Sequence, residues 1–208
     1  MSRVNRNSGR RREILEAFAR LLEAQPFGRV TTAALARELG ISEAALYRHF
    51  PSKARMIEGL IEFIEDTLFG RIRVILQETP GARDRLQQIG SLILVFAERN
   101  PGMVPLLTGD ALAGETDRLR RRIGQLYERL ETQFRQILRE GEARERLAPA
   151  APPAAIAGLL VALIEGKLQR FARSDFADRP TEHWPEQWRL LAAALLLPGV
   201  APPLPAIP

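Results

Sequence analysis

Apolar residues recur every three or four positions along most of the chain, and no long stretch alternates apolar with polar residues. This spacing places apolar side chains on one face of an α-helix, whereas a half-buried strand requires alternation. The longest series has steps of 4, 3, 4, 4 and 3 residues and comprises Leu119, Ile123, Leu126, Leu130, Phe134 and Ile137. We therefore expect an all-α protein in which this charged segment docks on a core, with a coiled coil as the alternative.

Proline, glycine and capping residues divide the chain into the expected helices. Ser42 and Ser52 can each cap the helix that follows, because a serine oxygen accepts from free backbone N–H groups. The expected helices cover residues 10–24, 32–39, 43–49, a long helix from 53 that bends at Gly70, 82–99, a helix within 110–145, 154–173 and 184–197. The proline-rich end, residues 198–208, is expected to be extended or disordered.

Positive charge is concentrated in the first quarter of the chain. The whole sequence has 30 Lys and Arg against 25 Asp and Glu, a net charge of +5. Residues 1–55 hold 11 of the basic and 5 of the acidic side chains, so this quarter is net +6 and the remainder is net −1. Because a local positive field attracts phosphates, a polyanion is the expected partner of this quarter.

Several classes of function are disfavoured by composition. The absence of cysteine excludes disulfides, thiolate nucleophiles and cysteine-based zinc sites. The two histidines, His49 and His183, lack metal-ligand spacing, and no glycine-rich phosphate loop occurs. We therefore expect no catalysis, cofactor or metal. The charged start is unlike a signal peptide, and no apolar stretch is long enough for a membrane span, so a cytoplasmic protein is expected.

Residues 31–50, TTAALARELGISEAALYRHF, predict two short helices that meet at Gly40. Glycine permits the positive φ that a sharp turn often needs, and Ala36 is small where the second helix must cross closely. This pattern is typical of a helix-turn-helix. An ordinary pair of packed helices is the alternative, and the local excess of positive charge favours DNA binding.

The second of these helices has side chains suited to the major groove. Ala44 and Ala45 are short and can contact thymine methyl groups, and Arg48 can contact a base or a phosphate. Hydroxyl, imidazole and ammonium groups nearby can donate to phosphates, as can backbone N–H groups at a helix N-terminus. The basic arm, residues 6–12, can follow phosphates or enter the minor groove. The predicted DNA-binding residues are Thr31, Thr32, Ser42, Ala44, Ala45, Tyr47, Arg48, His49 and Lys53.

LYRHFPSK (residues 46–53), with the preceding VTTAALARELGISEAA, resembles the TetR family of bacterial DNA-binding regulators. The resemblance implies an all-helical homodimer with a three-helix DNA-binding head and a larger helical body. The expected divisions are a basic arm and helix-turn-helix domain (1–52), a dimerisation and partner-binding domain (53–197) and the tail (198–208).

The segments LIEFIED (60–66), AERNPG (97–102) and LTGDAL (107–112) resemble the nucleoid occlusion factors of that family. The resemblance implies binding to palindromic chromosomal sites, where the protein engages the C-terminal tail of the division protein FtsZ and inhibits Z-ring assembly over the nucleoid. The implied FtsZ-binding residues are Phe63, Arg71, Leu92, Arg99 and Asn100. Val95 departs from the glycine of related proteins. A ligand-responsive TetR-type repressor is the alternative function.

The last two expected helices are broadly apolar, which is typical of helices that pair across a subunit interface. The predicted interface residues are Ile156, Leu160, Leu163, Trp188, Leu191 and Leu195. Packing into the core of one chain is the alternative for both helices. A dimer, or two dimers on one site, would match the symmetry of a palindrome.

Overall fold

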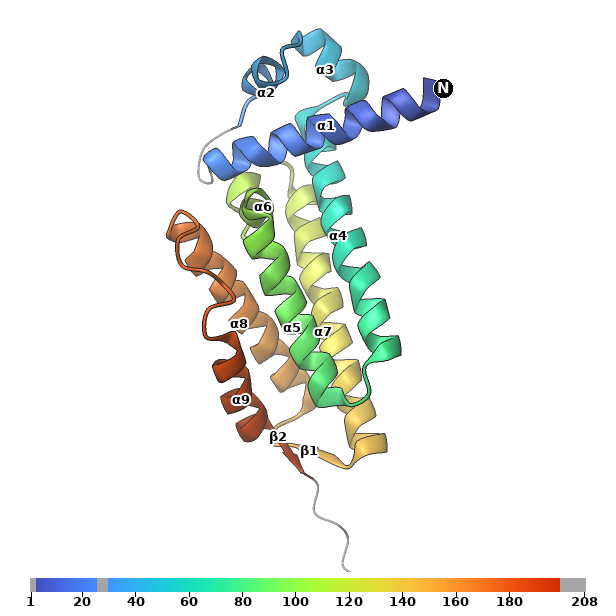
Figure 1. The fold of residues 1–208 in the computed structure, drawn as a ribbon, viewed down its shortest axis with the longest axis vertical. Coiled ribbons are helices and arrows are strands. Elements are labelled where there is room, and N and C mark those ends of the chain that lie inside the picture. The colour runs from blue at the N-terminus through green and yellow to red at the C-terminus, as the bar shows by residue number, and fades with distance from the viewer. Residues whose placement is uncertain (1–2, 26–29, 199–208) are drawn as a thin grey trace, which may run out of the picture.

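The computed structural model describes residues 3–25 and 30–198, and within these the chain is helical, as predicted (Figure 1). The helices are α1 (Arg3–Ala24), α2 (Thr32–Glu38), α3 (Glu43–His49), α4 (Lys53–Glu78), α5 (Ala82–Arg99), α6 (Val104–Leu107), α7 (Asp117–Glu145), α8 (Pro153–Arg173) and α9 (Trp184–Leu195). Two 3₁₀ turns, η1 (Pro101–Met103) and η2 (Asp110–Leu112), flank α6.

The described chain differs from the sequence-based expectation near both of its ends. Helix α1 begins at Arg3, so the whole basic arm, residues 6–12, is helical. Helix α4 is one long helix that includes Gly70, as expected. Two short strands, β1 (Leu147–Pro149) and β2 (Leu196–Pro198), form an antiparallel pair that periodicity did not predict. Pro198, the first residue of the tail that was expected to be extended or disordered, is paired with Leu147 in this strand pair. The rest of that expectation, residues 199–208, lies outside the described residues.

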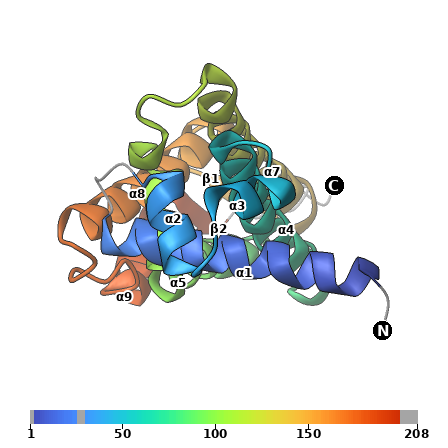
Figure 2. The same ribbon diagram turned by 90° about the horizontal axis from the view of Figure 1, so that it is seen from above.

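Helices α1, α2 and α3 form a head at one end of the molecule (Figures 1 and 2). Gly40, in the turn between α2 and α3, has a φ of 63°, the conformation that glycine adopts most easily. The side-chain oxygens of Thr31 and Ser42 accept from Ala34 N and Ala45 N and so cap α2 and α3. The head has its own buried apolar side chains, including Ile14, Phe18, Leu35, Leu46 and Phe50. The predicted helix-turn-helix is therefore present.

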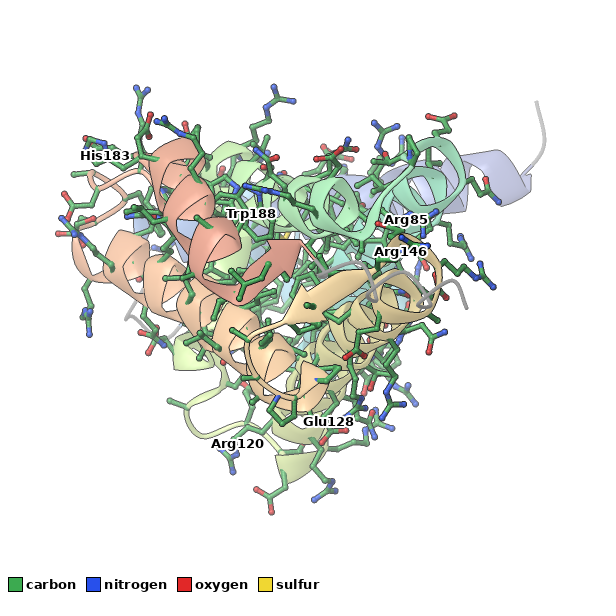
Figure 3. The ribbon with its side chains drawn as sticks, turned by 90° about the horizontal axis from the view of Figure 1, so that it is seen from below. Arg85, Arg120, Glu128, Arg146, His183 and Trp188 are labelled. Atoms are coloured by element: carbon green, nitrogen blue, oxygen red, sulfur yellow. The ribbon has the colours of Figure 1, made fainter. Side chains whose placement is uncertain are left out.

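The body is a bundle of α4, α5, α7, α8 and α9, which run along the long axis of the molecule (Figure 1). Helix α7 lies against α4, α5 and α8, and its whole apolar seam from Leu119 to Ile137 is buried. The seam thus faces the core of its own chain, as predicted for a docked helix. At the far end, β1 and β2 join the end of α7 to the end of α9, beyond Arg146 (Figure 3).

The head meets the body at two places. Helix α4 starts directly below α3 and continues into the bundle, and α1 lies across the upper end of the bundle against η1 (Figure 1). At the second contact, a Cβ atom added to Gly102 would fall 2.0 Å from the backbone oxygen of Ala19. Only glycine lets the two backbones approach this closely.

Candidate DNA interface and body surfaces

Helix α3 presents a row of solvent-exposed side chains on the head. Ala44, Tyr47 and Arg48 are exposed, and Ala45 and His49 are partly buried. Ser42 caps this helix with its oxygen at 3.2 Å from Ala45 N. Its hydroxyl hydrogen can still be donated to another acceptor, because a serine oxygen accepts and donates independently. The predicted base-contacting residues therefore share one accessible helix with a polar N-terminus.

A chain of hydrogen bonds ties α2 to α3. Thr32 Oγ1 donates to Glu43 Oε2 at 2.7 Å and accepts from Tyr47 Oη at 3.2 Å. Both hydroxyl hydrogens are thus used within the head, so Thr32 and Tyr47 must exchange these bonds before either can donate to a phosphate. Thr31 differs, because its oxygen only accepts from Ala34 N. The sequence analysis did not include Glu43 among the residues of the DNA interface. Its position as the first residue of α3 was the only signal that it could contact α2.

The C-terminal end of α3 is held by an arginine of α1. Arg11 Nη1 donates to the His49 backbone oxygen at 2.6 Å, and its guanidinium carbon lies 4.2 Å from the centre of the Phe50 ring. An arginine stacked on an aromatic face and bonded to a carbonyl oxygen at a helix C-terminus is held by two independent attractions. One residue of the predicted DNA-tracking arm therefore also fixes the orientation of α3.

Lys53, predicted to contact phosphate, is the first residue of α4. Its Nζ lies 2.9 Å from Oε1 of Glu115, in the connection between η2 and α7. The side chains are 28% and 15% exposed. The structure thus places Lys53 next to the head, where its ammonium group forms an ion pair with a carboxylate of the body.

Four of the five residues implied in FtsZ binding lie on α4 and α5, which pack against each other, and the fifth, Asn100, directly follows α5. Phe63 is 47% exposed, and its ring centre lies 6.4 Å from that of Phe96. Arg71 and Arg99 are exposed and Leu92 is partly buried. Asn100 Nδ2 donates to the Phe96 backbone oxygen at 2.7 Å and so closes the end of α5.

Val95, the residue that departs from related sequences, is partly buried on α5. It is three residues from Leu92 and four from Arg99, and this spacing places all three near one helix face. A side chain at this position therefore borders the surface formed by Phe63 and Leu92.

The residues predicted for the dimer interface differ in their burial within one chain. Ile156, Leu160 and Trp188 are at most 4% exposed within one chain, because α8 and α9 turn these side chains toward each other and the core (Trp188 is labelled in Figure 3). They offer little surface to a second copy. Leu163, Leu191 and Leu195 are partly buried and remain predictions.

The outward side of α8 and α9 carries different apolar residues. Leu159 is 48% exposed and Leu190 is 73% exposed. Small residues, Ala155, Ala162 and Gly166, are also exposed along α8. The periodicity of the helices identified their apolar character, and the packing within the chain decided which side remains accessible.

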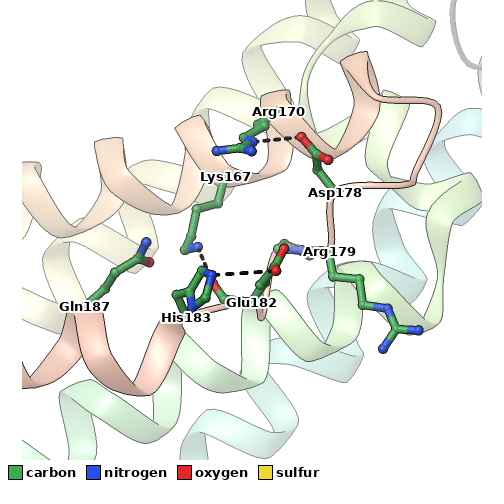
Figure 4. A pocket seen from close by; sticks show the side chains of 8 residues that line it. Lys167, Arg170, Asp178, Arg179, Glu182, His183 and Gln187 are labelled. Carbon is green, nitrogen blue, oxygen red and sulfur yellow. Dashed lines mark hydrogen bonds and ion pairs between the residues drawn. The ribbon is translucent and has the colours of Figure 1, made fainter.

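The connection between α8 and α9 encloses a pocket of about 160 Å³ (Figure 4). Arg170 Nε lies 2.9 Å from Asp178 Oδ2, and Lys167 Nζ donates to the Glu182 backbone oxygen at 3.2 Å. Partial burial, assisted by the nearby Arg170, lowers the pKa of Lys167. Because both cations are bonded to oxygens of this chain, these contacts hold the connection in place.

Two titratable side chains of the body, Tyr127 on α7 and Glu165 on α8, are partly buried. Tyr127 Oη donates to the Leu107 backbone oxygen at 3.2 Å, and burial raises the pKa of its phenol. Burial also raises the pKa of Glu165 on α8. Desolvation disfavours the charged form of each group.

The described residues, 3–25 and 30–198, also bear on metal binding and on membrane insertion. No group of three or more histidine, aspartate or glutamate side chains in this part of the chain is placed to hold a metal ion. None of the helices within the described ranges is long and apolar enough to cross a membrane.

Comparisons with known proteins agree with this arrangement. Residues 14–60 match the family model "Bacterial regulatory proteins, tetR family", and residues 82–196 match a model for the SlmA-like "Tetracyclin repressor-like, C-terminal domain". A solved TetR transcription regulator from Haloarcula marismortui has a TM-score of 0.76 at 20% identity, covering 91% of this chain and 100% of that one. One from Chloroflexus aurantiacus has the same TM-score at 21% identity, covering 93% and 99%.

Curated relatives are closer in sequence. A protein from Marinomonas sp. named nucleoid occlusion factor SlmA is 55% identical over 93% of this chain and 98% of its own length. A protein of the same name from Shewanella oneidensis is 51% identical, again over 93% and 98%. The chain therefore belongs to the nucleoid occlusion factor SlmA family, within the tetR family of bacterial regulatory proteins.

Proposed function

We propose that this protein is a sequence-specific DNA-binding factor that acts in nucleoid occlusion in the cytoplasm, bound to the chromosome. The exposed face of α3 is the observation that carries the proposal. Arg11 at its end and the Thr32–Glu43 bond at its start hold this helix in one orientation. A helix fixed on a net positive head is suited to the major groove, whose base edges it reads.

The proposed contacts divide into two kinds. Ala44, Ala45 and Arg48 face the bases, and polar groups around them position the head on phosphates. The proposed phosphate donors are Thr31, Thr32, Ser42, Tyr47, His49 and Lys53. In this division residues 1–52 form the DNA-binding domain, and residues 53–197 form the body that pairs two heads.

Two copies of the chain would read a palindrome through two-fold symmetry. The exposed leucines of α8 and α9, with the exposed small residues along α8, support pairing of these helices with those of a second copy, because small side chains allow close helix approach. Either one or two such dimers would occupy a site.

The α4–α5 surface is the proposed site for the C-terminal tail of FtsZ. The exposed Phe63 and the partly buried Leu92 offer apolar contacts, and Arg71 and Arg99 can pair with carboxylates of an extended peptide. Asn100 supports the end of α5 through its bond to Phe96. Engagement of the tail while the protein is on DNA would inhibit Z-ring assembly over the nucleoid.

A ligand-responsive repressor is the second candidate, supported by a trough of about 700 Å³ between α4 and α7. Phe69 and Ile72 form its apolar part, and Arg129 lies over the Phe69 ring at 3.7 Å. This volume falls in the range of small-molecule sites, which combine apolar walls with a few polar groups.

Pull-down of FtsZ with and without a chromosomal DNA site separates the two candidates. We expect DNA to strengthen FtsZ capture, and Arg99→Asp to abolish capture without changing DNA affinity, because the new carboxylate repels an acidic peptide. Arg83→Asp is the matched control, an exposed arginine of α5 set sixteen residues away, on the opposite side of the helix. FtsZ capture that ignores DNA and Arg99 would refute the first candidate.

A further inference from the structure

Lys53 and Glu115 form an ion pair between the head and the body. The two atoms are 2.9 Å apart, and Glu115 is the more buried partner, at 15% exposure. Glu115 follows Gly114, which has a φ of 78°, and its backbone nitrogen donates to the Leu112 oxygen at 3.0 Å. The carboxylate therefore reaches Lys53 from a tight glycine turn.

A DNA phosphate and the Glu115 carboxylate would compete for the same ammonium group. Lysine carries a compact point charge on a flexible four-carbon stem, so its ammonium can move from the carboxylate to a phosphate. We propose that Glu115 is a positioning residue that holds Lys53 away from DNA, so that binding transfers the ammonium from Glu115 to a backbone phosphate. The inference rests on the proposed DNA-binding function.

The transfer has a consequence for the body. A carboxylate that is 15% exposed and loses its cation must move toward water, because an unpaired charge is costly to bury. Glu115 is two residues before the start of α7, where Arg118 pairs with Glu58 and Arg122 Nη2 lies 2.7 Å from Glu65 Oε2. Binding of a DNA phosphate to Lys53 would thereby shift Glu115 and affect the contacts between the start of α7 and α4.

A double-mutant cycle tests the competition, with a random-sequence DNA duplex at low salt as the probe, since phosphate contacts do not depend on sequence. The four proteins are wild type, Lys53→Gln, Glu115→Gln and the double variant. We expect Lys53→Gln to weaken binding and Glu115→Gln to strengthen it by about two- to fivefold, the range for partly exposed pairs. In the Lys53→Gln background, Glu115→Gln should change affinity no more than the control does.

The control is Glu38→Gln, which removes a carboxylate of the head whose partner is Arg20 at 3.6 Å. It reports the general effect of losing one negative charge. Glu115→Ala repeats the test with a second variant, and thermal melts verify that all the proteins are folded.

The outcomes are distinct. An equal gain from Glu115→Gln with and without Lys53, or no gain at all, would overturn the competition. Unchanged DNA affinity of Lys53→Gln would also overturn the competition, because Lys53 would then make no phosphate contact. Failure of the wild-type protein to bind any duplex would instead refute the proposed function.

Discussion

Gly102→Ala should destabilise the junction between the head and the body. The added Cβ would lie 2.0 Å from Ala19 O and 2.7 Å from Ala19 C, both in the backbone of α1. A backbone atom cannot rotate away as a flexible side chain can. Helix α1 and η1 would have to separate by about 1.4 Å to restore an ordinary contact of 3.4 Å.

The magnitude follows from overpacking. Inserting one methyl group into a closely packed contact costs about 1–3 kcal/mol, and a rigid backbone neighbour favours the upper half of that range. We expect a loss of about 2 kcal/mol in the free energy of unfolding, or roughly 4–8 °C in melting temperature for a chain of this size. DNA affinity should fall as well, because α1 carries the Arg11 contact that orients α3.

The assay is urea and thermal unfolding of wild type, Gly102→Ala and Gly124→Ala. Gly124 lies on the exposed side of α7 and has no atom within 4 Å of an added Cβ. The same substitution there should stabilise the protein by about 0.5–1 kcal/mol through helix propensity. If Gly102→Ala unfolds like Gly124→Ala, the close approach of α1 and η1 is wrong.

Two further predictions concern the body. Leu190→Arg should weaken the proposed dimer, because it places a charge on the outward face of α9. Sedimentation velocity at decreasing concentration would detect the loss, and an unchanged oligomeric state would exclude this face from the interface. Because burial raises the pKa of Glu165, the folded chain keeps that proton to higher pH than the unfolded chain, and stability falls as pH rises through the raised pKa. Glu165→Gln should therefore be more stable than wild type above that pKa and equally stable below the ordinary glutamate pKa. Parallel urea titrations at stepped pH test this. A difference in the free energy of unfolding that stays constant across pH would contradict the prediction.

Much of the fold was predictable because its signals are local. The apolar seam of α7, the caps at Thr31 and Ser42, and the turn glycine at Gly40 act within a few residues of where they stand. The boundaries of α3 and α5 agree with their sequence signals for the same reason. The strands were missed because each has three residues and depends on its partner for its hydrogen bonds.

The candidate sites were predictable as residue types and less so as contacts. The sequence predicts that residues 43–49 lie on one exposed helix. Residue spacing alone predicts neither the Thr32–Glu43 hydrogen bond nor the hydrogen bond from Arg11 to the His49 backbone oxygen. The dimer residues show the same limit, since periodicity marks α8 as apolar on a broad face without saying which part the chain itself covers.

The helical architecture, the helix-turn-helix and the positive charge of the head follow from the order of the residues, because periodicity, capping and charge are properties of neighbouring residues. The packing of the helices, in contrast, brings Lys53 to Glu115 and Gly102 to Ala19 and turns Trp188 inward. These contacts join residues far apart in the chain, and they exist only once the helices have packed.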